Sequence, residues 1–388
     1  MPDRSSRRIQ SVQFPIIPKI AEKIAKTPGT ISLGQGVVYY GPPEQALHRV
    51  SDFLQNPDYH KYGAVHGMTP LCGAIAKKLS RENRLDLGGV EIVVTAGSNM
   101  GFYHAVLAIS DPGDEFIIAD PYYFNHEMAI TMAGCRPVLV PVDADYQLQP
   151  ALIAAAITAK TRAVVTISPN NPTGAVYSAE SLKAVNALCR QAGIYHISDE
   201  AYEYFVYDSN RHFSPASIPG ASGHTISLYS LSKAYGFASW RIGYMAIPSG
   251  LRAAISKIQD TILICPPLIS QFAALAALEA GRGYFQSKFG RIVAMRAELL
   301  SVLRELDEFV EPPVSQGAFY TLLKLRSECD DLALVEQLIQ RYRIAVIPGS
   351  AFGIRRGCFI RIAYGALNPE AAEVATGRLV EGLRGLLS

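Results

Sequence analysis

A chain of 388 residues is too long for one simple core, so we expect a large domain of roughly 200 to 250 residues and a smaller one. Apolar residues make up 49% and charged residues 18%, which is typical of a well-packed soluble enzyme and excludes extensive disorder. The 36 basic and 34 acidic residues leave a net charge of +2, and the longest basic cluster is the short Arg4–Arg8 segment. A nucleic-acid partner is therefore not expected.

The six cysteines are scattered and form no C-x-x-C pair, so neither a zinc site nor a disulfide framework is predicted. They are typical of small buried side chains in a reducing compartment. The first ten residues lack the apolar core of a secretory signal. The apolar stretch 262–278 is interrupted by Pro266, Pro267 and Gln271, which argues against a membrane span. We expect a cytoplasmic protein without a metal site.

The first forty-five residues, rich in Pro and Gly, are predicted to form an arm and a strand that join the smaller domain. From residue 90 onward, short β-rich runs alternate with amphipathic helical segments such as 100–110 and 179–191. This alternation predicts an α/β fold with a mostly parallel sheet flanked by helices, in a large domain over residues 46–281. The predicted strands are 91–95, 115–119, 136–141, 162–168, 194–198, 225–230 and 243–247.

The pattern changes after Gly281-Arg282-Gly283. A long helix is predicted over Tyr284–Leu306, and a closing helix begins at Pro369. Between them lie three strand-like runs, which favour a smaller α+β domain over residues 282–388. These runs are 319–325, 344–347 and 359–363.

Lys233 is the first candidate for chemistry. It follows an apolar run in the sequence Ser230-Leu231-Ser232-Lys233, with Arg241 eight positions later and Asp199 thirty-four positions earlier. An amine with the ordinary pKa near 10.4 is protonated at neutral pH, and it becomes a nucleophile when burial and nearby cations disfavour its charged form. A random lysine is a solvated surface residue about nine times in ten, so the identification depends on its context.

Four further segments supply that context, although each has a plain structural explanation. Ser168–Gly174 is a strand-to-helix turn with two prolines, and Ser198–Tyr202 ends a strand with two acids that could cap a helix. Thr95–Asn99 opens a helix, where free N–H groups can bind phosphate. In Cys358–Ile362 one arginine, Arg361, lies in an apolar strand, so it needs an anionic ligand or an internal carboxylate.

In this order and at these intervals, the segments resemble the fold-type I pyridoxal phosphate (PLP) enzymes, specifically the class I/II aminotransferases. The resemblance covers nearly the whole chain. It implies the PLP-dependent transferase fold, with PLP as cofactor. Further matching segments are Ile31-Ser32-Leu33-Gly34-Gln35-Gly36, Tyr62-Gly63, Gly317-Ala318-Phe319-Tyr320 and Pro348-Gly349-Ser350-Ala351-Phe352-Gly353.

The resemblance implies three catalytic residues. Lys233 would form the imine with the cofactor and carry the proton between the substrate Cα and the cofactor. Asp199 would pair with the pyridine nitrogen and keep it protonated, because a nearby carboxylate favours the charged ring. Tyr202, together with Asn171, would hydrogen-bond the cofactor's phenolic oxygen. Tyr123 matches the aromatic residue that stacks on the cofactor ring.

The resemblance also implies where anions bind. The α-carboxylate of the substrate would be bound by Arg361, close to Asn171 and the backbone of Gly36. Tyr62 matches a residue that reaches the phosphate from a neighbouring subunit, so a homodimer with shared active sites is expected. The cofactor phosphate would lie against N–H groups and side chains contributed by Gly97, Ser98, Asn99, Ser230 and Arg241.

Two positions depart from the family pattern. Ser239 replaces the usual glycine or small residue two positions before Arg241, which is a mild change. Asn99 stands where one subgroup of bacterial aspartate aminotransferases has a lysine that receives the substrate's side-chain carboxylate. A preference for aspartate is therefore not supported, and the apolar, aromatic loop Val37–Tyr40 suggests a hydrophobic or aromatic amino donor.

Three functions are compatible with these residues. The first is an aminotransferase that moves an amino group from an L-amino acid to a 2-oxo acid in a ping-pong cycle. The second is a PLP-dependent β-lyase of the cysteine-conjugate type, or a synthase or decarboxylase, on the same fold. The third is a sensor domain of a transcription regulator, which is disfavoured because no helix-turn-helix segment precedes the arm. The sequence fixes neither the amino donor, nor the acceptor, nor the pathway.

Overall fold

The computed structural model describes residues 4–367 and 369–388, so the first three residues of the predicted arm lie outside the described residues. Its centre is a seven-stranded sheet with the order β2-β8-β7-β6-β5-β3-β4. Only β8 runs antiparallel to its neighbours, which confirms the mostly parallel sheet predicted from the sequence. The strands are β2 (Val90–Thr95), β3 (Glu115–Asp120), β4 (Arg136–Pro141), β5 (Thr161–Ile167), β6 (Tyr195–Asp199), β7 (Thr225–Ser230) and β8 (Gly243–Pro248).

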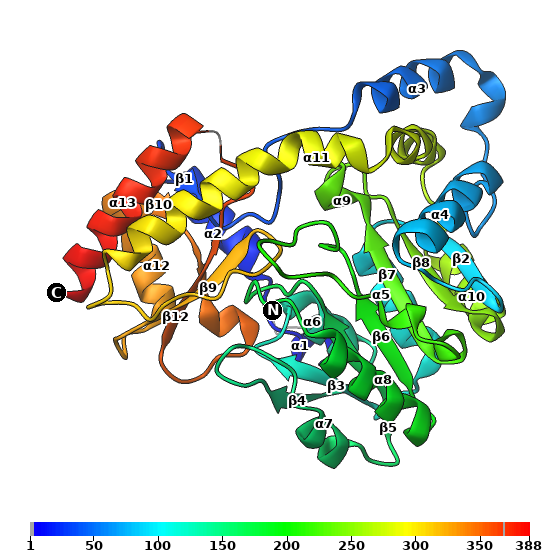
Figure 1. Ribbon diagram of the computed structural model, residues 1–388, viewed down its shortest axis with the longest axis horizontal. Coiled ribbons are helices and arrows are strands. Elements are labelled where there is room, and N and C mark those ends of the chain that lie inside the picture. The colour runs from blue at the N-terminus through cyan, green and yellow to red at the C-terminus, as the bar shows by residue number, and fades with distance from the viewer. Residues whose placement is uncertain (1–3, 368) are drawn as a thin grey trace.

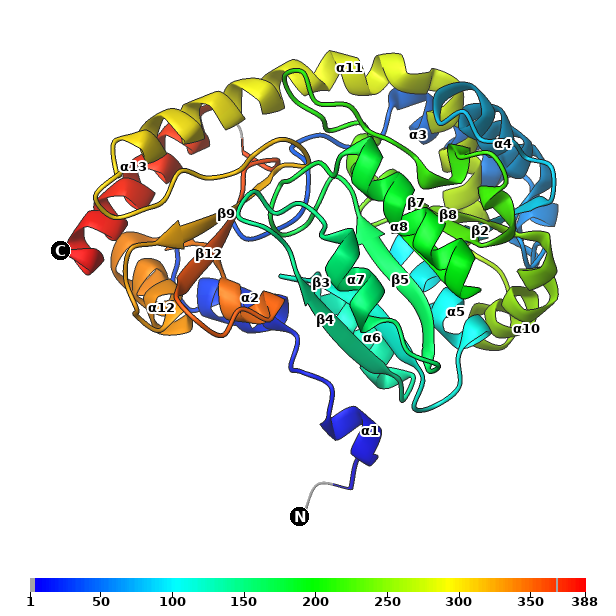
Figure 2. The same ribbon diagram turned by 60° about the horizontal axis from the view of Figure 1, so that its bottom comes forward.

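Helices cover both faces of this sheet, as Figure 2 shows. The inner strands carry apolar side chains on both faces because each face packs on a core: on β3, Phe116 and Ile118 belong to one core and Ile117 to the other. The first core contains residues from α5 (Ser98–Ile109), α6 (Phe124–Met132) and α10 (Arg252–Leu263). The second contains residues from α7 (Pro150–Ala156) and α8 (Ala179–Ala192).

A smaller set of strands forms beside the large sheet. The strands β9 (Tyr320–Leu325), β12 (Cys358–Ala363) and β11 (Ile347–Pro348) make an antiparallel sheet with β12 in the middle. The N-terminal strand β1 (Ile31–Ser32) pairs in parallel with β10 (Ile344–Ala345). The single strand predicted over 344–347 is therefore wrong, because its two halves pair with different partners.

The remaining helices frame these sheets. The helix α11 (Leu268–Arg304) is longer than the predicted helix, packs on α3 and α4 at one end and on α13 at the other, and spans both parts (Figure 1). Gly281 interrupts its helical geometry with φ 70° and ψ −170°. The other helices of the described residues are α1 (Arg7–Gln10), α2 (Ile16–Ala25), α3 (Glu44–Gln55), α4 (Thr69–Glu82), α9 (Leu231–Ala234), α12 (Asp331–Tyr342) and α13 (Pro369–Leu387), together with the short 3-10 helices η1 (Pro57–His60), η2 (Pro215–Ser217), η3 (Ala221–Gly223), η4 (Ser249–Leu251) and η5 (Gly349–Phe352).

All six cysteines are free thiols, and three of them are buried. The Sγ atoms of Cys329 and Cys358 lie 2.8 Å apart, a proximity that their separation by 29 positions did not indicate. Among the described helices, none combines the length and the apolar character that a bilayer crossing requires.

The segment 33–41 crosses from the small sheet to the short helix α9. At one end the carbonyl oxygen of Leu33 accepts from the N–H of Ala363, and at the other the hydroxyl of Tyr40 donates to the carbonyl oxygens of Lys233 and Ala234. Gly236 has φ +70°, and a Cβ there would lie 2.5 Å from the carbonyl oxygen of Gly41. Only glycine allows this close crossing. The crossing brings the small sheet to the carboxyl ends of the large-sheet strands.

Candidate active site

A cavity of about 250 Å³ opens at the carboxyl ends of β6 and β7 and at the start of α5. Such edges are the usual ligand sites of parallel sheets. A larger hollow of about 910 Å³ lies beside residues 353–357 and contains none of the predicted site residues, so size alone does not identify the site. The smaller cavity is lined by nine of the predicted residues, namely Ser98, Asn99, Tyr123, Asn171, Asp199, Tyr202, Ser230, Lys233 and Arg241.

Lys233 enters this cavity from α9, directly after β7. Its Nζ donates to the carbonyl oxygen of Gly36 at 2.6 Å. Burial is the largest cause that lowers the pKa of this amine to about 8, and the guanidinium groups of Arg361 and Arg241 lower it further, while Asp199 opposes them. An amine with this pKa is partly neutral at physiological pH, and neutrality is the condition for nucleophilic attack.

Asp199 lies at the end of β6 and is buried. Its Oδ1 accepts from the N–H of Ala201 at 3.0 Å, and its Oδ2 lies 3.2 Å from Nε2 of His126. The His126 ring stacks on Phe102 with the centroids 3.9 Å apart. These contacts fix one carboxylate at the wall of the cavity. Sequence reasoning missed His126, although its place three residues after Tyr123 at the start of a helix was an available signal.

Arg361 lies on β12, and only 2% of its surface is exposed. Its Nη1 donates to Oδ1 of Asn171 at 2.8 Å and its Nη2 to the carbonyl oxygen of Gly34 at 2.7 Å, while its Nε has no hydrogen-bond partner among the described residues. The rings of Tyr320 and Phe352 lie 4.5 and 5.0 Å from the guanidinium carbon. Within the described ranges no carboxylate comes within 4.0 Å, so this buried cation has neutral partners only and can receive an anion.

Glycine is required at position 36 because the Tyr320 hydroxyl leaves no room for a side chain, a contact that the sequence alone did not indicate. A Cβ at this position would lie 2.1 Å from the hydroxyl oxygen of Tyr320, whose hydroxyl in turn lies 2.9 Å from that of Tyr202. Burial raises the pKa of Tyr202 well above its ordinary value, which keeps this phenol protonated and able to donate. Tyr123, another residue of the cavity wall, is held by Asn125, whose Nδ2 donates to the Tyr123 hydroxyl at 2.8 Å. Asn125 also lines the cavity and was not predicted.

The start of α5 forms an anion cradle. Gly97 is its N-cap with φ 83°, and no side chain caps the helix, so the first N–H groups are available to a ligand. A Cβ at Gly97 would lie 2.5 Å from Nη2 of Arg241. That guanidinium donates to the carbonyl oxygen of Ala238 at 2.9 Å and has no acidic partner in the part of the chain that the structure describes. Ser230 lies beside it at the end of β7.

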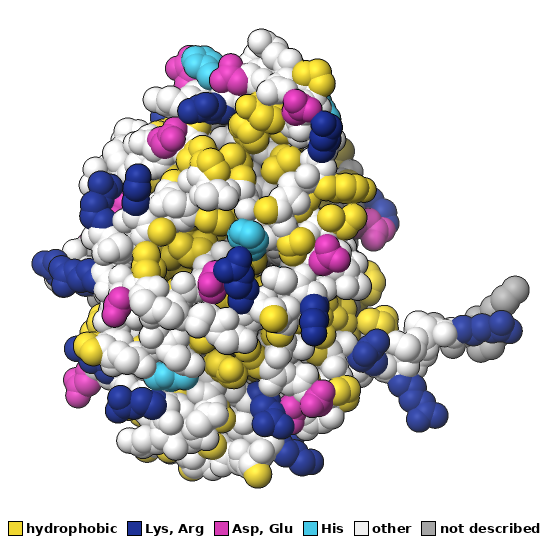
Figure 3. Space-filling view, turned by 90° about the vertical axis from the view of Figure 1, so that its right-hand side faces the viewer, with side chains coloured by type: hydrophobic (Ala, Val, Ile, Leu, Met, Phe, Trp, Pro, Cys, Tyr) yellow, Lys and Arg dark blue, Asp and Glu magenta, His cyan; other side chains and the backbone are white. Residues whose placement is uncertain are grey.

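Tyr62 does not join this cluster. It lies between η1 and α4 with 80% of its surface exposed. The face that carries α3, α4 and α10 has further hydrophobic side chains on its surface, as Figure 3 shows. Exposed examples from these elements and their ends are Leu47, Leu54, Ile262 and Ile264.

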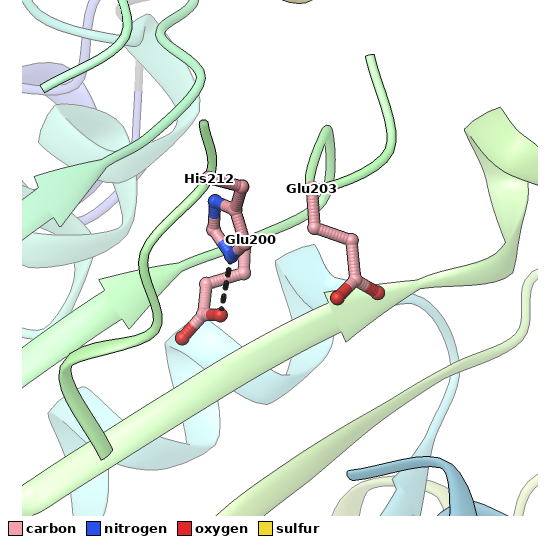
Figure 4. Close-up of side chains that lie close together, drawn as sticks. All are labelled: Glu200, Glu203 and His212. Atoms are coloured by element: carbon pink, nitrogen blue, oxygen red, sulfur yellow. Dashed lines mark hydrogen bonds and ion pairs between the residues drawn. The ribbon is translucent and has the colours of Figure 1, made fainter. Parts of the chain in front are cut away.

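A second acidic cluster, shown in Figure 4, consists of Glu200, Glu203 and His212, whose ligand atoms lie within 4.8 Å of one another. The Glu200 carboxylate contacts Nε2 of His212 at 2.9 Å and accepts from the Ser214 hydroxyl at 2.5 Å. Glu203 forms an ion pair with Lys78. Because both carboxylates are already paired, we interpret the cluster as a hydrogen-bonded network beside the site rather than as a metal centre.

Comparison with known proteins agrees with this geometry. The family model "Aminotransferase class I and II" matches residues 28–379. An aromatic aminotransferase of Arabidopsis thaliana is 34% identical and covers 98% of this chain and 97% of its own length. An aspartate aminotransferase of Rhizobium meliloti (strain 1021) is 33% identical over 94% of this chain and 93% of its own. The structure of Thermus thermophilus aspartate aminotransferase with maleate superimposes with a TM-score of 0.89 at 30% identity, covering 98% of this chain and all of that one.

The lowered pKa of the Lys233 amine predicts an unusual pH profile for aldehyde capture. About a tenth of the amine is neutral at pH 7, so the yield should rise with pH and level off above about pH 8.5. The protein is incubated with an aryl aldehyde, reduced with cyanoborohydride and mapped by mass spectrometry, with the exposed Lys77 as internal reference. A yield at Lys233 that is still rising steeply at about pH 10 would contradict the lowered pKa.

Proposed function

Since this chain belongs to the class I and II aminotransferases, we propose that it uses pyridoxal phosphate to transfer the amino group of an L-amino acid to a 2-oxo acid. One observation carries the proposal. Lys233 and Arg241 line one cavity with a single buried carboxylate, Asp199, and the buried Arg361 donates to Asn171 in the wall of that cavity. This arrangement suits a ligand with an aldehyde, a phosphate and a basic ring nitrogen, together with a substrate that carries a carboxylate.

The residues present fit the cofactor. The uncapped start of α5 and the guanidinium of Arg241, which has no carboxylate partner among the described residues, suit a phosphate. Lys233 would hold the aldehyde carbon through its amine, and Asp199 would face the ring nitrogen. Asn171 and Tyr202 would donate to the phenolic oxygen, and Tyr123 would lie against the ring. The phosphate would be bound by Gly97, Ser98, Asn99, Ser230 and Arg241.

When bound, the cofactor supplies an electron sink for the pair left when the Cα–H bond breaks. The chain's own residues do the rest. Arg361 binds the α-carboxylate through its planar guanidinium, with Asn171 beside it, and so orients the substrate. The Lys233 amine is near enough to neutral to take the Cα proton and to return it. The rings of Tyr320 and Phe352 are fully buried and exclude water from the carboxylate end.

The same groups would serve both half-reactions. An amino donor and an oxo-acid acceptor both carry an α-carboxylate, and the cavity borders one buried arginine, Arg361, suited to it. Donor and acceptor would therefore bind in turn, which is the basis of a ping-pong cycle, with 2-oxoglutarate as a suitable acceptor.

We expect Lys233→Ala to abolish both covalent capture and turnover. Borohydride reduction of the wild type should fix the cofactor to residue 233, and the variant should bind it reversibly and transaminate at least about a thousandfold more slowly. The matched control is Lys77→Ala, which removes an exposed lysine. Turnover retained in the Lys233→Ala protein would refute the assignment.

We also propose that the amino donor has a neutral, apolar or aromatic side chain. Two features support this. The cations of the site are already assigned to the aldehyde, the phosphate and the α-carboxylate, and Asn99 has no charge that could bind a carboxylate in the donor's side chain. With 2-oxoglutarate as acceptor, kcat/KM for phenylalanine should exceed that for aspartate by at least about tenfold. Asn99→Lys should lower the ratio of kcat/KM for phenylalanine to kcat/KM for aspartate. A preference of the wild type for aspartate would overturn the proposal, and ammonia released without any acceptor would indicate β-elimination.

A homodimer with shared active sites is our remaining proposal for this site. Tyr62 is exposed next to α4, the face that carries α3, α4 and α10 has exposed apolar side chains (Figure 3), and Tyr62 would reach the phosphate bound by a second copy. Light scattering should give twice the 42.1 kDa of the chain. Tyr62→Phe should weaken the affinity for pyridoxal phosphate about tenfold without dissociating the dimer. A fully active monomer would contradict the shared site.

A further inference from the structure

Tyr320 connects the two parts of the molecule that build the site. It is the first residue of β9 in the small sheet and only 1% of its surface is exposed. It pairs with Ala363 on β12, and Arg361 lies two residues before Ala363, so the two side chains share one face of that sheet. The guanidinium carbon of Arg361 lies 4.5 Å from the ring centroid of Tyr320. The ring therefore supports the guanidinium from one side.

The hydroxyl of Tyr320 leaves the small sheet and reaches the large one. It lies 2.9 Å from the hydroxyl of Tyr202, which follows β6. No other hydrogen-bond partner of the Tyr320 hydroxyl occurs in the described ranges. Its position leaves no room for a side chain at Gly36, where a Cβ would lie 2.1 Å from the same oxygen. The absence of a side chain at Gly36 therefore leaves space for the Tyr320 hydroxyl.

Two physical effects follow from this contact. A hydroxyl that accepts one hydrogen bond becomes a stronger donor in another, so a bond from Tyr320 would strengthen donation by Tyr202 to a ligand. Both rings also fix orientation, because they meet edge to face at 80° with centroids 5.4 Å apart. A shift of the Arg361 guanidinium would move the ring beneath it and hence the hydroxyl pair.

On the basis of the proposed function, we infer that Tyr320 is a positioning residue that aligns the substrate-carboxylate site at Arg361 with the Tyr202 hydroxyl. Its ring sets the plane of the guanidinium, and its hydroxyl sets the direction of the Tyr202 phenol. The contact thereby holds the small sheet and the large sheet in a fixed relative position while the substrate reacts.

The test uses the dimeric holoenzyme and two substitutions. Tyr320→Phe keeps the ring and removes the hydroxyl, so kcat should fall about three- to tenfold while KM for the amino donor stays within about twofold. Tyr320→Leu also removes the ring, so KM should rise about tenfold in addition. Without substrate, the pH midpoint of the visible absorbance of the Tyr320→Phe holoenzyme should rise, because a weaker donor at Tyr202 stabilises the phenolic oxyanion less.

The control is Tyr229→Phe, because Tyr229 is also buried, has its hydroxyl 3.2 Å from that of Ser214 and has a cation, Lys78, 4.9 Å from its ring centroid. This variant should keep the wild-type kcat and absorbance midpoint. In a Tyr202→Phe background, Tyr320→Phe should cause no further loss of kcat, since both act on one hydrogen bond.

Three results would overturn the inference: an unchanged kcat and midpoint in Tyr320→Phe, losses that Tyr229→Phe reproduces, or additive losses in the double variant. Each of these is judged against an active wild type. A wild type that binds pyridoxal phosphate but transfers no amino group would instead remove the proposed function, so the two failures are distinguishable.

Discussion

An excess of positive charge governs this site. Lys233 and Arg241 line a cavity in which Asp199 is the one carboxylate among the lining residues, and Arg361 lies behind its wall, hydrogen-bonded to the lining residue Asn171. The two guanidiniums donate to neutral oxygens, so their charge remains available to ligands. Burial of the amine, and after it the field of these guanidiniums, lowers the pKa of Lys233 to about 8. One electrostatic arrangement therefore produces both the nucleophile and the receptors for the phosphate and the carboxylate.

The fold produces this arrangement by bringing two sheets together at one edge. The parallel strands β6 and β7 end at the cavity and deliver Asp199 and Lys233, while α5 brings its free N–H groups to the same edge. Arg361 comes from the small sheet, and the segment 33–41 ties that sheet to α9 through Gly36 and Tyr40. The helix α11 spans both parts. Because Arg361 lies in the small sheet while Lys233 and Arg241 lie next to strands of the large sheet, the spacing of the three cations depends on how these parts pack.

The sequence placed together those predicted site residues that follow strand ends. The strand pattern and the resemblance together indicated Lys233, Asp199 and Arg241, and all three line one cavity. Contacts between residues far apart in the chain could not be predicted in this way. The pairing of Tyr202 with Tyr320 joins residues 118 positions apart, and the predicted strand at 344–347 was wrong because only tertiary pairing divides it. Periodicity predicts which face of an element is buried, but it does not identify the side chain on the other side of the contact.

The central claim is that the excess positive charge and the low-pKa amine together form a site for one aldehyde phosphate per chain. An absorbance titration of the protein, stripped of any cofactor, with pyridoxal phosphate tests it most directly. We expect a saturable yellow absorbance at one equivalent per chain, and at least about hundredfold weaker binding of pyridoxal, which lacks the phosphate. A protein that stays colourless with either aldehyde, or that binds both equally, would show that the site does not have this charge arrangement.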